Sequence, residues 1–210
     1  MDLYFFDLDR TLYAYNFRYR LPELARLSGA SQYQIASSWW AGQYEIRAEA
    51  GEWPTADAYL DEFARITGGR RLSLEEWASA RAPSMSRIDA SVEALRRAAE
   101  LGTVCLLSNN PAPLGEALPL LAPDVVEIVG DNILVSYMLG IRKPEPELFT
   151  RALDRFGASA SSTFFADDSA ENIAGARSVG ITAYHVEYVG EVPQTGTLMP
   201  ALEAFAGRDR

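Results

Sequence analysis

Several short apolar runs in this sequence end abruptly at a polar or acidic residue. They are short and do not alternate as a half-exposed strand would, so they are typical of strands buried on both faces of a parallel sheet. The clearest are Leu3–Phe6 before Asp7, residues 103–107 before Ser108, residues 163–166 before Asp167, and residues 182–186, with residues 125–129 as a weaker candidate.

Helical patterns lie between these runs. Residues 146–156 place their apolar side chains on one face, and Gly157 is suited to end that helix. Asp89 can cap a helix that stops at Gly102, and Ser169 can cap a third. Strands that alternate with helices predict βαβ units and a parallel sheet, in which ligands bind beyond the carboxyl ends of the strands.

Residues 13–87 interrupt this alternation, because they hold helical patterns and no convincing strand. Ser31 begins one pattern, which continues to Ile46, and Thr55 can cap a second. Ser73 begins a third with a capping-box pattern. A helical insert is therefore expected directly after the first strand.

Charge and composition exclude several partners. The 210 residues carry a formal net charge of -10, which repels nucleic acid and anionic membranes. No apolar stretch approaches the roughly 20 residues of a membrane span, and the first residues lack a signal-peptide pattern, so a cytoplasmic protein is expected. A phosphate ester bound to such an acidic chain requires positive charge supplied locally.

Asp7 and Asp9 follow the first predicted strand. A carboxylate can attack phosphorus, and a second one nearby can protonate the leaving oxygen and later deprotonate water. A pair of turn aspartates accounts for this spacing equally well when it stands alone.

Ser108 and Asn109 follow the second predicted strand, and Lys143 precedes a predicted helix. A hydroxyl, an amide and backbone N–H groups at a strand end can hold phosphoryl oxygens, although such residues are also ordinary in turns. Lys143 can supply the local positive charge, whereas a lone lysine is normally solvated.

Asp167 and Asp168 come directly after a very apolar run. Adjacent acids are costly there unless they bind a cation, and oxygen ligands without nearby His or Cys favour Mg²⁺. The alternative is a helix N-terminus that happens to carry two acids. All four segments, in this order and beside predicted strand ends, favour one shared site.

With these segments in place, the sequence resembles hydrolases of the haloacid dehalogenase (HAD) superfamily over essentially the whole chain. Residues 139–145 and 167–177 are similar to the branch that contains α-D-glucose-1-phosphate phosphatases, and residues 7–13 are similar to pyrimidine 5′-nucleotidases. The four matching motifs are Asp7-Leu8-Asp9-Arg10-Thr11, Ser108-Asn109, Lys143-Pro144 and Asp167-Asp168.

The resemblance implies an α/β fold with a Rossmann-like core, whose parallel sheet carries helices on both faces. It also implies an all-helical cap of subfamily I, inserted after the first strand. The expected division is a core of residues 1–12 and 88–210 and a cap of residues 13–87.

The family's motifs imply roles for individual residues. Asp7 is the expected nucleophile, Asp9 the acid and base, and Lys143 the group that stabilises charge. The expected ligands of Mg²⁺ are Asp7, the backbone carbonyl of Asp9, and Asp168, with Asp167 in support.

Further residues are expected at the phosphate or in support of the site. Thr11, Ser108 and Asn109 are candidates for binding the phosphoryl group or the nucleophile. Arg10 stands where many members carry a small residue or Asn, so it can contact substrate, affect the cap or point to solvent. Arg18 is equally compatible with substrate contact and with solvated surface. Asn172 is expected to brace the acidic loop. His185 and Cys105 are expected to pack in the core or at its edge.

The expected function is Mg²⁺-dependent hydrolysis of small phosphate monoesters, with a sugar phosphate favoured. A nucleoside 5′-monophosphatase and a sugar phosphomutase remain alternatives. Asp9 counts against a 2-haloacid dehalogenase, because a halide leaving group needs no proton. A catalytically silent binding protein on the same fold is the non-enzymatic alternative. The sequence predicts no oligomeric state.

Overall fold

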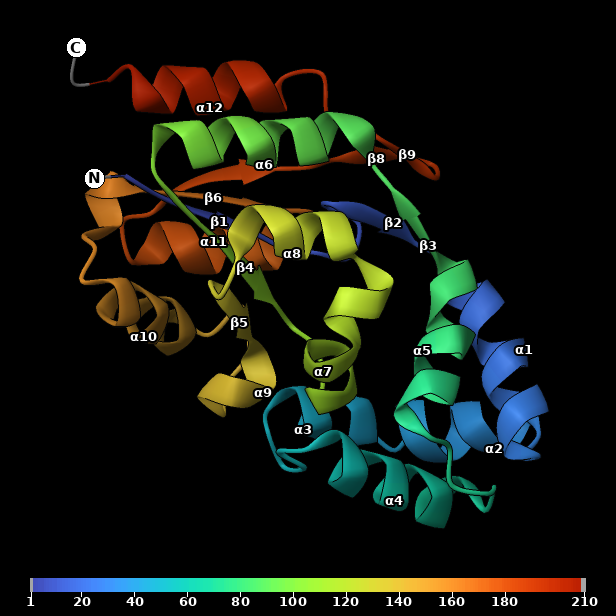
Figure 1. The fold of residues 1–210 in the computed structure, drawn as a ribbon. Helices are drawn as coiled ribbons and strands as arrows, with labels where there is room; N and C mark the ends of the chain where they lie inside the picture. The colour runs from blue at the N-terminus through green and yellow to red at the C-terminus, as the bar shows by residue number, and fades with distance from the viewer. Residues whose placement is uncertain (1, 209–210) are drawn as a thin grey trace.

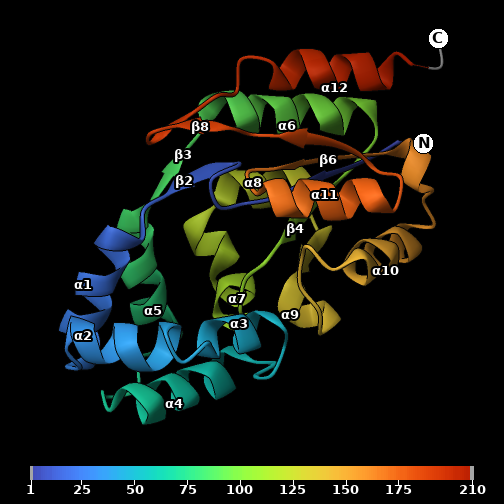
Figure 2. The same cartoon turned by 180° about the vertical axis from the view of Figure 1, so that it is seen from behind.

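The computed structural model describes residues 2–208, and its centre is a parallel sheet (Figures 1 and 2). The strand order is β5-β4-β1-β6-β7, and every neighbouring pair in it is parallel. Its strands are β1 (Leu3–Phe6), β4 (Thr103–Ser108), β5 (Ile133–Val135), β6 (Thr163–Asp167) and β7 (Thr182–His185).

Strand β1 lies in the middle of the sheet because its side chains are apolar on both faces. Tyr4 and Phe6 join one hydrophobic core, whereas Leu3 and Phe5 join the other. All of these side chains are buried. The continuous apolar run predicted from the sequence is therefore explained by a strand that helices cover on both sides.

Helices cover both faces of the sheet, as the predicted α/β fold class requires (Figures 1 and 2). Helices α6, α7, α8 and α12 pack in the core of Tyr4 and Phe6, and α10 and α11 pack in the core of Leu3 and Phe5. These elements are α6 (Asp89–Leu101), α7 (Ala112–Leu121), α8 (Pro123–Val129), α9 (Ser136–Leu139), α10 (Pro146–Phe156), α11 (Ala170–Ser178) and α12 (Leu198–Ala206).

Residues 13–87, which we call the cap, lie at the end of the sheet where the strands terminate (Figure 1). Ser31, Thr55 and Ser73 cap helices there as the sequence predicts, and Trp39 is fully buried among aromatic rings. The elements are β2 (Tyr13–Tyr15), α1 (Phe17–Ser28), α2 (Gln32–Ile35), a π-helical turn (Ala36–Trp40), α3 (Tyr44–Glu49), α4 (Ala56–Thr67), α5 (Leu74–Arg81) and β3 (Met85–Arg87).

Two predictions about strands are wrong. Residues 125–129 belong to helix α8: Pro123 occupies its first turn, and Val125 and Val129, four residues apart, are buried on one side. The cap is not free of strands either, because β2 and β3 pair antiparallel at its two ends. These short strands form the connection between the cap and the sheet (Figure 1).

Two helix boundaries also differ from prediction. The capping position before α6 is Ile88. Asp89 lies in the first turn, where its negative charge interacts favourably with the positive end of the helix dipole. The pattern that begins at Ser31 does not continue unbroken to Ile46, because Gln43 adopts a φ of 60° between the π-helical turn and α3.

Two smaller features complete the fold. The hairpin of β8 (Tyr188–Val189) and β9 (Val192–Pro193) follows the edge strand β7. Among residues 2–208, none of the helices combines the length and the apolar character needed to cross a bilayer.

Candidate active site

The carboxyl ends of β1, β4 and β6 bring three of the predicted segments together. Asp7 follows β1 directly, Ser108 ends β4, and Asp167 ends β6. The Asp7 N–H donates to the Ala166 carbonyl at 3.0 Å, which continues the sheet pairing to the acidic side chain. A cavity of about 280 Å³ opens at this edge, and Asp7, Asp9, Ser108, Lys143 and Asp168 all line it.

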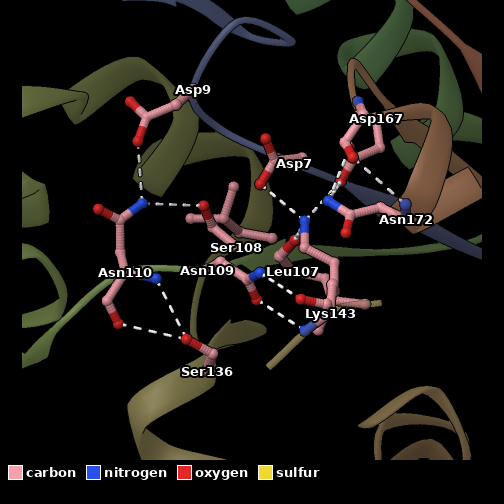
Figure 3. Close-up of polar contacts among 12 residues, drawn as sticks. Asp7, Asp9, Leu107, Ser108, Asn109, Asn110, Ser136, Lys143, Asp167 and Asn172 are labelled. Carbon is pink, nitrogen blue, oxygen red and sulfur yellow. Dashed lines mark hydrogen bonds and ion pairs between the residues drawn. The ribbon is translucent and has the colours of Figure 1, made fainter. Parts of the chain in front are cut away.

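Lys143 is the only lysine in the chain, and 1% of its surface is exposed. Its Nζ donates to Asp7 Oδ1 at 2.8 Å, to Asp167 Oδ2 at 2.6 Å and to the Leu107 carbonyl at 2.8 Å (Figure 3). An ammonium has three donors, so each one is used. The compact ammonium thus lies between two buried carboxylates at the ends of adjacent strands and offsets one unit of their negative charge.

Asn109 holds the backbone of Lys143 rather than leaving its amide free. Its Nδ2 donates to the Lys143 carbonyl at 2.8 Å, and its Oδ1 accepts from the Lys143 N–H at 2.9 Å (Figure 3). Both ends of the amide are therefore used to place the lysine. The predicted phosphate contact of Asn109 can still be made by its backbone N–H and by the second N–H of its amide, and the residue lines the cavity.

The burial of Lys143 predicts that its amine reacts slowly with acylating reagents, because acylation needs an exposed, neutral amine. The neighbouring carboxylates raise the pKa of Lys143 despite its burial. We expect an N-hydroxysuccinimide ester to modify Lys143 at least tenfold more slowly in folded protein than in urea, where the side chain is exposed. Peptide mass spectrometry over time measures both rates, and equal rates would contradict the buried position.

Burial dominates the electrostatics of Asp7. It raises the pKa of Asp7 from 3.8 to about 8, and the Asp167 carboxylate acts in the same direction, whereas Lys143 opposes both. A carboxylate must be ionised to attack phosphorus. An additional positive charge beside Asp7 would favour that ionised form.

Asp7, Asp167 and Asp168 offer carboxylate oxygens that all lie within 4.8 Å of one another. Such an oxygen-only set is what Mg²⁺ prefers. Asn172 donates to Asp167 Oδ1 at 3.0 Å and to its Oδ2 at 3.1 Å, so the predicted brace of the acidic loop is confirmed. With Lys143 also on its Oδ2, Asp167 is suited to support a cation indirectly, and Asp7 and Asp168 to bind it.

Arg10 approaches the acidic cluster from the cavity wall. Its Nε donates to Asp168 Oδ2 at 2.6 Å, and its guanidinium lies 4.0 Å from the ring centre of Tyr188 in the β8–β9 hairpin. Tyr188 also donates to the Arg10 carbonyl at 2.9 Å. The structure thus pairs Arg10 with a predicted metal ligand at the wall of the cavity, although 38% of its side chain stays exposed.

Asp9 has partners that the sequence did not predict. Arg81, from the last turn of cap helix α5, places Nη2 2.6 Å from both carboxylate oxygens. Asn110 donates to Asp9 Oδ2 at 3.0 Å and to Ser108 Oγ at 3.1 Å (Figure 3). No pattern along α5 distinguishes Arg81 from the other cap arginines, so its role emerges only in three dimensions.

The cap contributes a second charged residue, which the sequence analysis also missed. Glu49, at the end of α3, accepts from Arg142 Nε at 2.8 Å, and both side chains line the cavity. Burial raises the pKa of Glu49 to about 7, although Arg142 opposes the rise. The Glu49 carbonyl accepts from Ser136 Oγ at 2.7 Å, so this part of the cap contacts the core twice.

The remaining predicted residues lie in different surroundings. Thr11 is fully buried, and its Oγ1 has no hydrogen-bond partner among residues 2–208. Arg18 lies exposed at the start of α1 and is not part of the cavity lining. His185 hydrogen-bonds the Asp168 carbonyl through Nε2 at 2.8 Å, and Cys105 is buried within β4.

Comparison with known proteins places this site in a family. A relative with a curated description, a phosphatase from Mycobacterium tuberculosis, is 28% identical over 201 residues, which cover 89% of this chain and 87% of the relative. The family model described as haloacid dehalogenase-like hydrolase matches residues 1–180.

Solved structures share the fold. A predicted HAD-like family hydrolase from Porphyromonas gingivalis superposes with a TM-score of 0.75 at 19% identity, covering 99% of this chain and 98% of its own. A HAD family enzyme from Bacteroides thetaiotaomicron, solved as a magnesium complex, gives a TM-score of 0.72 at 22% identity over 88% of this chain and 92% of its own. The chain therefore belongs to the haloacid dehalogenase-like hydrolases, as its four motifs predict.

Proposed function

We propose that this hydrolase is a Mg²⁺-dependent phosphatase, which cleaves small phosphate monoesters through an aspartyl-phosphate on Asp7. The observation that carries the proposal is the contact of Lys143 Nζ with Asp7 Oδ1 at 2.8 Å, in a cavity that Asp9 and Asp168 also line. The phosphatase from M. tuberculosis supports the same reaction class.

Two displacements make up the proposed reaction. An Asp7 oxygen attacks phosphorus, the bond from phosphorus to the ester oxygen breaks, and Asp9 gives its proton to the leaving alkoxide. A water molecule then attacks phosphorus, Asp9 takes its proton, and the bond from phosphorus to Asp7 breaks. The net result is one alcohol and one phosphate, with Asp7 and Asp9 restored.

The carboxylates at the site fit a divalent cation, because their oxygens lie within 4.8 Å of one another. Asp7, Asp168 and the backbone carbonyl of Asp9 would hold Mg²⁺, with Asp167 in support. Bound there, the ion neutralises acidic charge and helps to align the phosphoryl group. The magnesium complex of the B. thetaiotaomicron enzyme supports this choice of metal.

The residues of the chain supply the remaining stabilisation. Lys143 keeps positive charge against Asp7 throughout, and Ser108 and the backbone of Asn109 would donate to phosphoryl oxygens. Phosphoryl transfer depends mainly on such positioning and neutralisation.

We further propose that residues 13–87 act as a cap over a core of residues 1–12 and 88–210. Cap residues Glu49 and Arg81 reach the cavity or its acid. The pair of Glu49 and Arg142 presents both a hydrogen-bond acceptor and a donor to the leaving group. This favours a leaving alcohol that carries further hydroxyl groups. A sugar phosphate therefore remains the favoured substrate, with a nucleoside monophosphate second.

A substrate panel with Mg²⁺ tests the proposal. We expect phosphate release from p-nitrophenyl phosphate and from at least one sugar phosphate, each followed by a colorimetric phosphate assay. A sugar phosphate that returns as its isomer, without free phosphate, would instead favour a phosphomutase. Complete inactivity across sugar phosphates, nucleotides and p-nitrophenyl phosphate would favour the silent binding protein.

Metal removal gives a separate prediction. We expect excess EDTA to lower turnover at least 100-fold, because the acids around Asp7 then lack the cation that neutralises them. Added Mg²⁺ in excess over EDTA should restore the rate. Isothermal titration of Mg²⁺ into the Asp168→Asn variant and the wild type gives a binding readout, and equal affinity would contradict the proposed ligand.

A further inference from the structure

Arg81 is an almost completely buried arginine that contacts the proposed acid from the cap. Its exposed surface is 2%, and its Nη2 lies 2.6 Å from both Asp9 oxygens. Its guanidinium also lies 4.7 Å from the ring centre of Tyr15. A long side chain held on two sides in this way has little rotational freedom, so its contact with Asp9 is well defined.

Asp9 is held between two parts of the molecule. Asn110, after core strand β4, donates to Asp9 Oδ2 at 3.0 Å, and Arg81 approaches from cap helix α5. Figure 3 shows the Asp9 carboxylate directed toward Asn110 and away from Asp7. The direction of this carboxylate therefore depends on one core residue and one cap residue.

Arg81 also stands where the cap joins the core. It ends α5, and the short helix Ala82–Ser84 and strand β3 follow at once. Ser84 donates through Oγ to the Arg81 carbonyl, which ties the arginine backbone to this connection. Any displacement of α5 relative to the sheet would change the distance between Arg81 and Asp9.

We infer that Arg81 is a positioning residue, which sets the direction of the Asp9 carboxyl group and so links the cap to proton transfer at the leaving oxygen. The inference rests on the proposed phosphatase function. Arg81 itself exchanges no proton: Asp9 gives its proton to the alkoxide while the bond from phosphorus to that oxygen breaks. Arg81 acts by fixing the direction of the Asp9 carboxyl group, together with Asn110.

Leaving groups of different basicity separate this role from general damage. The value of kcat/KM reports steps up to departure of the first product. An alkyl phosphate needs a proton on its departing oxygen, whereas p-nitrophenolate leaves without one. We expect Arg81→Met to lower kcat/KM roughly 30- to 100-fold for an alkyl phosphate and less than about fivefold for p-nitrophenyl phosphate. The first loss is smaller than the roughly 10²- to 10⁴-fold that general acid catalysis contributes as a whole, because Asp9 itself remains.

Two further variants sharpen the experiment. Arg81→Lys keeps a cation within reach and should recover part of the alkyl phosphate rate. In the Asp9→Asn background, Arg81→Met should change kcat/KM for p-nitrophenyl phosphate less than twofold, because the residue through which it acts is gone. In Arg81→Met, the inhibition constant of inorganic phosphate should stay within twofold of the wild-type value, since Arg81 does not line the cavity.

Arg20 provides the matched control. It is also 2% exposed, donates to the Tyr15 hydroxyl at 3.1 Å, and lies 4.8 Å from the Trp77 ring centre. Among the hydrogen bonds and ion pairs of residues 2–208, it makes none with Asp9. Arg20→Met should therefore lower the stability of the cap and change kcat/KM for both substrates by the same factor.

The outcomes are distinguishable. Equal losses for both substrates in Arg81→Met, or an undiminished loss in the Asp9→Asn background, would overturn the positioning role while leaving the phosphatase proposal standing. A wild-type protein that releases phosphate from neither substrate would overturn both. Thermal unfolding of each variant, followed by circular dichroism, shows that the compared proteins are folded.

Discussion

Substitution of Asp7 by asparagine is expected to abolish turnover while the fold remains. An amide oxygen is a poor nucleophile, so no aspartyl-phosphate can form, and removal of a nucleophile typically costs roughly 10⁴- to 10⁶-fold in kcat. Steady-state assays with p-nitrophenyl phosphate and Mg²⁺ measure the loss. Activity of Asp7→Asn within tenfold of wild type would reject Asp7 as the nucleophile.

The same variant has an expected effect on stability, which follows from the pKa of Asp7. Burial raises this pKa from 3.8 to about 8. A carboxyl group whose pKa is higher in the folded state stabilises the fold at low pH, and that contribution is lost as the pH rises from about 4 toward 8. At pH 7 without Mg²⁺, Asp7→Asn should therefore unfold at or above the wild-type temperature.

Asp154→Asn is the matched control for this substitution. Asp154 lies exposed on α10, and the chemical change is the same. Both its activity and its unfolding temperature should equal those of the wild type. Loss of activity in this variant as well would show that the assay responds to something other than the site.

The sequence predicted the sheet and the acidic cluster because both leave local signatures. Strands buried on two faces read as short apolar runs, and the residues that follow them must lie at one edge of a parallel sheet. Asp7, Ser108 and Asp167 were found in this way, and each lies where expected. Lys143 was located by its motif, and its position as the only lysine adds an independent signal.

The contributions of the cap could not be predicted, for a physical reason. Arg81 and Glu49 reach the site through the packing of helices against one another. Local spacing indicates which face of a helix is buried, but not which residue of the core a polar side chain on that helix will meet. Residues 125–129 were misjudged as a strand because a short apolar run fits a strand and a buried helix face equally well. The preceding Pro123 was the local signal that favoured the helix.

Of the single substitutions proposed here, Lys143→Met should lower the free energy of unfolding the most. It leaves Asp7 and Asp167, 6% and 0% exposed, without the ammonium that lies between them. Removal of one partner from a buried ion pair typically costs about 3–5 kcal/mol of unfolding free energy. Urea unfolding at pH 7 without Mg²⁺ measures this loss, and turnover should fall to background.

The loss in Lys143→Met should depend on pH with a definite sign. Without the lysine, the pKa of Asp7 rises further above its wild-type value of about 8, so above that pH the folded variant stays protonated where the folded wild type ionises. The difference in stability from wild type should therefore shrink as the pH falls from 9 to 7. A difference that is constant over this range would mean that Lys143 contributes packing rather than charge.

A second substitution distinguishes charge from packing directly. Asp7→Asn combined with Lys143→Met removes one acid together with the base, which leaves Asp167 with the Ser169 N–H and the Asn172 amide as donors. We expect the double variant to be more stable than Lys143→Met alone, although neither turns over substrate. If it is equally unstable, the buried lysine is needed mainly to fill space, and the neutralisation on which the proposed reaction depends must come from elsewhere.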